Sequence, residues 1–156
     1  MYKFTERQKQ ADVEKFLRRL ADRAASKWMS NRCERRNESR CGQSMPVYMA
    51  RWDGASFSKE EATIALSRDV SSQGIAVVVV GPFQAKRVVM AFWVESRPCF
   101  ALGEVHNEAP MGGGYRRLGI ELIELLDVAD HPSLQELIPL TARLAPMFTA
   151  EAANRD

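Results

Sequence analysis

The chain has 156 residues, of which 46% are hydrophobic and 27% are charged. This length corresponds to about one ordinary domain, and the composition excludes a wholly disordered chain, a collagen and a mucin-like stalk. The formal net charge is only +2, but residues 1–51 hold 13 of the 22 Lys and Arg residues and 6 of the 20 Asp and Glu residues. We therefore expect an anion to bind in this basic amino-terminal third, unless the first 30 residues are simply a solvated basic helix.

The sequence contains no candidate membrane span and no disulfide framework. The longest central apolar stretch, from Ile75 to Val80, is far shorter than the ~20 residues that a span needs. The first ten residues, MYKFTERQKQ, lack the apolar core of a secretory signal, so we expect a cytoplasmic protein. Cys33, Cys41 and Cys99 are odd in number and form no CxxC pair, which argues against disulfides and a zinc cage.

Residues 1–30 predict an amphipathic helix, and residues 31–44 predict a polar linker. Thr5 is the expected N-cap. Apolar residues then recur at helical spacing, at Val13, Phe16, Leu17, Leu20, Ala24 and Trp28. The linker has no apolar periodicity and contains four arginines.

Residues 45–127 predict a β domain. Six runs rich in valine, isoleucine and aromatic residues cover 45–51, 62–68, 74–80, 86–94, 99–105 and 115–122. Turn signals separate them at Asp53-Gly54, Gly81-Pro82, Arg97-Pro98 and the glycine triplet 112–114. We predict a mainly β protein, a six-stranded antiparallel barrel, because closure of such short strands leaves none without a neighbour.

Residues 128–156 predict a C-terminal helix and a frayed tail. Pro132 suits the first helical turn, and Ser133 followed by Glu136 resembles a capping box. The apolar face of this helix would cover one mouth of the barrel or a partner subunit. The apolar stripes on both terminal helices leave two alternatives open, a homodimer and packing on the chain's own barrel.

No catalytic or metal-binding pattern is present. His106 and His131 lie on different predicted elements, outside HExxH or HxE patterns, so we expect no metal and no cofactor. The glycine triplet 112–114 precedes a strand and is not followed by Lys-Ser or Lys-Thr, so it is not a P-loop. Cys41 stands beside Arg40 but has no histidine partner. We therefore expect no enzymatic activity.

Two short patterns carry the functional prediction. The linker contains RxxxR at residues 36–40, and the junction of the second and third strands contains DxSxxG at residues 69–74. RxxxR alone is uninformative, because it also occurs at residues 19–23 and 32–36. DxSxxG is more specific, since chance predicts roughly 0.04 matches in such a chain even when either Asp or Asn is accepted at the first position. An ordinary Asx-type turn between two strands is the structural alternative.

Together these patterns resemble the PilZ family, bacterial receptor domains for the second messenger cyclic di-GMP. The resemblance covers about residues 35–127 and includes Pro46, six residues after Arg40, and the closing strand Tyr115–Leu122. It implies a six-stranded antiparallel barrel followed by a helix, and cyclic di-GMP as the ligand. The amino-terminal helix departs from the family pattern.

The ligand's chemistry suggests a role for each candidate residue. Arg36 and Arg40 offer forked donors to phosphate or to guanine O6 and N7. Asp69 can accept hydrogen bonds from guanine N–H groups or hold an arginine, and Ser71 offers a hydroxyl. The remaining two candidates are Gly74, which would allow positive φ or close approach of the ligand, and Arg35, which would contact a second ligand molecule.

Ligand binding is expected to order the linker and change how the amino-terminal helix sits, which would relay the signal to an unidentified effector protein. One alternative is a PilZ-like protein-interaction adaptor without a ligand. Another is a nucleic-acid-binding module that uses the basic amino-terminal third. The arginines there are not interleaved with aromatic residues, which disfavours the nucleic-acid alternative.

Overall fold

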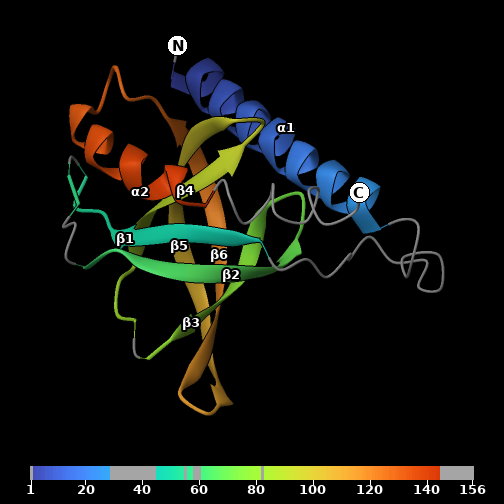
Figure 1. Ribbon diagram of the computed structural model, residues 1–156. Helices are drawn as coiled ribbons and strands as arrows, with labels where there is room; N and C mark the ends of the chain where they lie inside the picture. Colours follow the sequence, from blue (N-terminus) through green and yellow to red (C-terminus); the bar gives the residue numbers. More distant parts are fainter. Residues whose placement is uncertain (1, 29–44, 55, 58–60, 82, 145–156) are drawn as a thin grey trace.

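A computed structural model describes residues 2–28, 45–54, 56–57, 61–81 and 83–144, with the side chains of the first helix described for residues 6–21. Its elements are, in chain order, α1 (Tyr2–Trp28), β1 (Pro46–Arg51), β2 (Thr63–Val70), β3 (Gly74–Val80), β4 (Arg87–Val94), β5 (Arg97–Gly112), β6 (Tyr115–Leu126), the 3₁₀ helix η3 (Pro132–Leu137) and α2 (Ile138–Ala142). Figure 1 shows α1 lying across one end of the β structure. No helix in these ranges is long and apolar enough to cross a membrane.

The six strands form a closed antiparallel barrel in the order β1-β2-β3-β6-β5-β4. Pairing of β1 with β4, which aligns Tyr48 with Ala91, closes the barrel. The predicted mainly β architecture, with one helix before the barrel and a short one after it, is confirmed. The fifth strand is longer than predicted, because β5 continues to Gly112 and pairs with β6 in a hairpin that projects from the barrel (Figure 1).

The barrel interior and α1 share one hydrophobic core. Inward-facing residues such as Val88, Met90 and Phe92 are fully buried in this core. The helix adds four buried side chains, Val13, Phe16, Leu17 and Leu20. The ring of Phe16 meets that of Phe92 edge to face, with 5.1 Å between the ring centroids. The described part of the apolar stripe of α1 therefore packs on the chain's own barrel.

The C-terminal segment packs on the outside of the barrel. Leu134 and Leu137 of η3 form a second cluster with outward-facing residues that include Val89 and Ala91 of β4. Strand β4 is consequently buried on both faces, which explains its uninterrupted apolar sequence. We expected the C-terminal helix to cover one mouth of the barrel or a partner subunit. The described residues of η3 instead pack on the outer face of β4, and α1 completes the interior cluster.

Three local predictions at element ends are wrong. The first helix begins at Tyr2, so Thr5 lies inside it and is not its N-cap. The N-cap of η3 is His131, so Ser133 lies inside the helix and is not its N-cap, although Pro132 does lie in the first turn.

The third error concerns the turn between β4 and β5. This turn is not Arg97-Pro98, which belongs to β5, but the preceding pair Glu95 and Ser96. Both have positive φ, 52° and 63°. Positive φ at both central residues is what a two-residue hairpin loop of type I′ requires. Glu and Ser rarely adopt this conformation, so the sequence gives no turn signal there.

We predict that Phe16→Ala lowers the free energy of unfolding by about 3–5 kcal/mol, because it removes a buried ring from the shared core. Urea denaturation followed by circular dichroism measures this loss. Lys15→Ala, on the exposed side of the same helix, is the matched control and should change stability by less than about 0.5 kcal/mol. Equal effects of the two variants would show that α1 is not docked on the barrel.

We also predict slow alkylation of Cys99. Burial raises the pKa of the Cys99 thiol above its ordinary value, and the nearby Arg19 and Arg97 offset this only in part. At neutral pH the folded protein therefore holds less thiolate than an ordinary thiol does. In a Cys33→Ser/Cys41→Ser variant, iodoacetamide should react more slowly with the folded protein than with glutathione, and urea should abolish the difference. A folded thiol as reactive as the unfolded one would contradict this.

Candidate functional site

The turn that joins β2 to β3 is built around the hydroxyl of Ser71. This oxygen accepts hydrogen bonds from the backbone N–H groups of Gln73 (3.3 Å) and Gly74 (3.2 Å), and it donates to the Gly74 carbonyl (3.3 Å). The Ser71 backbone N–H donates to the same carbonyl at 2.9 Å. A hydroxyl has one donor and two acceptor sites, so the turn occupies all of them. The serine of the DxSxxG pattern therefore shapes the turn.

Of the two roles that we predicted for Gly74, positive φ is wrong and close approach of a ligand stays a prediction. Its φ is not positive, in contrast to Gly54, Gly81 and the glycine triplet. A Cβ at Gly74 would lie only 2.1 Å from the carbonyl oxygen of Ile120 on β6. The missing side chain lets β3 approach β6 closely where the two strands begin to pair.

Asp69 faces outward because β2 contains a bulge. The register with β3 shifts between Ser67 and Asp69, so one extra residue lies between them. In a regular strand Asp69, two residues after the buried Ser67, would point inward as Ser67 does. Instead, its carboxylate forms an ion pair with the guanidinium of Arg117 on β6, at 3.3 Å. The carboxylate of the DxSxxG pattern is thus presented on the outer surface.

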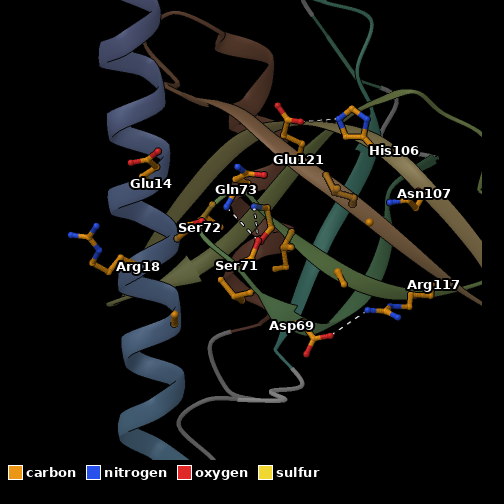
Figure 2. A pocket seen from close by; sticks show the side chains of 18 residues that line it. Glu14, Arg18, Asp69, Ser71, Ser72, Gln73, His106, Asn107, Arg117 and Glu121 are labelled. Atoms are coloured by element: carbon orange, nitrogen blue, oxygen red, sulfur yellow. Dashed lines mark hydrogen bonds and ion pairs between the residues drawn. The ribbon is translucent and has the colours of Figure 1, made fainter. Parts of the chain in front are cut away.

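Asp69, Ser71, Gly74 and Arg117 all line one open pocket of about 850 Å³, which lies between the outer surface of the barrel and α1. Figure 2 shows Asp69 and Arg117 pointing toward one another, with the Ser71–Gln73 turn beside them and α1 along one side. The helix contributes Glu14 and Arg18, and β5 contributes His106 and Asn107. The turn predicted from the sequence therefore shares a pocket with the amino-terminal helix.

The described part of the pocket is not electropositive. Its carboxylates belong to Glu14, Asp69 and Glu121, and its guanidinium groups belong to Arg18 and Arg117. The imidazole of His106 contacts the Glu121 carboxylate at 2.9 Å. An anionic ligand therefore needs further positive charge from elsewhere in the chain.

The remaining predicted site residues, Arg35, Arg36 and Arg40, lie outside the described residues. Their predicted approach to the turn stays a prediction. Sequence reasoning missed Arg117 and Asn107, which reach the pocket only through strand pairing. Arg117 stood inside the segment that resembles the closing PilZ strand, and this was the one available signal for it.

Comparisons with known proteins give a distant structural likeness. No protein-family model matches the chain, and no curated protein matches it. Among solved structures, the chain is similar to the Bacillus subtilis inhibitor of motility (MotI/DgrA), with 21% sequence identity and a TM-score of 0.40 over 67% of this chain and 48% of that one. The matched region thus spans about half the length of that protein. A likeness this distant does not identify the family, so the motif resemblance stays a prediction.

We predict that Gly74→Ala lowers the free energy of unfolding by roughly 1–3 kcal/mol, because the new methyl group collides with the backbone of β6. Urea denaturation measures the change. Ser72→Ala in the same turn is exposed and should change stability by less than about 0.5 kcal/mol. Unchanged stability of the Gly74→Ala variant would show that this glycine serves something other than strand packing.

Proposed function

We propose that this chain is a PilZ-type receptor that binds cyclic di-GMP through Arg36, Arg40 and the Asp69–Gly74 turn. The observation that carries the proposal is the outward-facing Asp69, which stands with the turn in an open pocket bordered by α1. A carboxylate there can accept hydrogen bonds from the N–H groups of guanine. The pocket is large enough for a nucleobase ligand.

The charge of the pocket suggests that the barrel and the linker bind different parts of the ligand. Two phosphates of a cyclic dinucleotide require cations, which the described pocket does not supply in excess. Arginines of the linker carry forked donors that match phosphate oxygens and guanine O6 and N7. In this proposal the barrel binds the bases, while Arg36 and Arg40, with Arg35 as a further contact, bind the phosphates.

The proposal extends to a relay through α1. This helix precedes the linker in sequence, docks on the barrel core and lines the same pocket as the turn. Among its described side chains, two form ion pairs with the barrel, the partly exposed Lys9–Glu124 and the exposed Arg19–Glu95, and pairs in contact with solvent contribute little stability. Ligand binding at the junction can therefore change the position of α1 and alter contact with an effector protein.

We predict that Arg36→Ala and Arg40→Ala each weaken cyclic di-GMP binding about five- to 150-fold, since each loses one bidentate contact worth roughly 1–3 kcal/mol. Isothermal titration calorimetry measures the affinity, with GTP and cyclic di-AMP as ligand controls. Arg19→Ala and Arg23→Ala on α1 are the matched variants and should bind as the unmodified protein does. Equal losses at both pairs would indicate nonspecific electrostatics. The same titrations give the stoichiometry, and two ligand molecules per chain would support the predicted contact of Arg35.

The relay predicts that cyclic di-GMP slows amide exchange in residues 30–44, because binding orders the linker. Hydrogen exchange with mass spectrometry measures this. Exchange that is identical with and without ligand would refute the relay. Failure to bind cyclic di-GMP would favour the ligand-independent adaptor. Strongly salt-dependent binding of nucleic acid would favour a nucleic-acid-binding module.

A further inference from the structure

The outer surface of the barrel is apolar on two sides, which differ in how they are covered. On the first side, η3 and α2 pack against β1, β4 and β5, where Leu134 and Leu137 complete the second cluster. Figure 1 shows α2 beside β1, with β2 on the far side of β1. On the second side, formed by β2, β3 and the start of β6, large apolar side chains are exposed.

The exposed side chains form two neighbouring rows. Leu66 of β2 is aligned with Val78 of β3, and Val80 of β3 is aligned with Tyr115 of β6. Residues two apart in a strand point to the same face, so Ile64 lies beside Leu66. We call these five residues the outer patch. Four of them are among the six large hydrophobic residues that are exposed in the described part of the chain. A contiguous patch of this kind marks a surface that binds something.

The outer patch continues the covered surface without a break. Tyr48 of β1 is partly buried against the second cluster, and strand pairing aligns it with Ile64 of the patch. The cover that η3 and α2 provide is therefore one strand short of the patch. Leu144, the last described residue of this C-terminal segment, is itself buried.

The sequence after Leu144 has the length and the composition to extend this cover. Residues 145–156 read APMFTAEAANRD, with Met147 and Phe148 three and four residues after Leu144. Three or four extended residues span about 10–14 Å. Strands β2 and β3 lie only about 5 and 10 Å beyond β1. The two large apolar side chains of this segment can therefore reach the patch.

The charges at the edge of the patch match those of the same segment. Arg68 follows Leu66 by two residues and is exposed. It forms no ion pair with another residue of the described part of the chain. Glu151 follows Phe148 by three residues. An exposed pair of Arg68 with Glu151 would add little stability but would favour one direction of the segment across the strands.

We propose that residues 145–156 lie across the outer patch, with Met147 and Phe148 on Leu66 and Val78. Burial of apolar surface on both sides of this contact drives the docking. The inference goes beyond the proposed receptor function and does not depend on it, since no ligand takes part. A second copy of the chain and a separate partner protein are the other occupants that the test distinguishes.

The cover is tested by the reactivity of a thiol placed in the patch. Leu66→Cys is introduced into the full-length Cys33→Ser/Cys41→Ser variant, and alkylation by iodoacetamide is followed by peptide mass spectrometry, which separates each thiol. Leu125→Cys is the matched control, because Leu125 is also exposed, 37% against 46% for Leu66, but lies outside the patch.

Replacing Met147 and Phe148 together by serine should raise the alkylation rate of Leu66→Cys about five-fold or more, as expected for a cover that is in place at least about four-fifths of the time. The rate of Leu125→Cys should not change. Unchanged melting temperatures show that the variants fold. An unchanged rate of Leu66→Cys would overturn the proposal and leave the patch to a separate partner protein.

A disulfide test identifies the occupant. Phe148→Cys combined with Leu66→Cys should form an intramolecular disulfide under mild oxidation, whereas Phe148→Cys with Leu125→Cys should not. A disulfide that joins two chains, with alkylation rates that depend on protein concentration, would overturn the proposal in favour of a second copy. Because cyclic di-GMP is absent from both tests, their failure leaves the receptor proposal standing.

Discussion

The structure depends on closing a six-stranded barrel whose interior the strands alone do not fill. Pairing of β1 with β4 completes the ring of strands, and β4 is then buried from both sides. The interior core is completed by four apolar side chains of α1, with Phe16 in edge-to-face contact with Phe92. Because the helix is part of the core, its position is coupled to the strands that present the pocket. A ligand bound at the junction of helix and barrel, as proposed above, would therefore act on a contact that the fold itself needs.

The candidate site follows from two departures from regular strand geometry. The bulge in β2 turns Asp69 outward, and the hydroxyl of Ser71 uses its three hydrogen-bonding positions to close the following turn. Ser71 must therefore exchange a bond within the turn before it can donate to a ligand, whereas Asp69 and Asn107 present polar atoms at the surface. This favours a site in which the turn supplies shape and the neighbouring strands supply recognition.

The sequence predicts the fold well because the spacing of apolar residues follows the periodicity of the strands and helices that they form. The runs of β-branched residues predicted all six strands, and β3 was predicted with its observed ends, Gly74 and Val80. The patterns failed where geometry depends on partners distant in the chain. Residues 106–112 alternate poorly and were not predicted as strand, because they pair in a projecting hairpin and are mostly exposed. The DxSxxG residues were found by motif, but Arg117 and Asn107 join them only through the register of four strands.

The projecting part of β5 has an unpaired outer edge, to which a strand of another chain could add. The backbone N–H of Val105 donates to the Lys86 carbonyl, and after Val105 no described strand pairs with the outer edge of β5. The backbone groups on this part of β5 are therefore exposed to strand addition by another chain. Three features oppose that addition. Pro110 has no N–H to donate, Glu108 adds charge, and register shifts around His106 and Met111 bend the strand. The hairpin can thus extend into solvent without recruiting a second sheet.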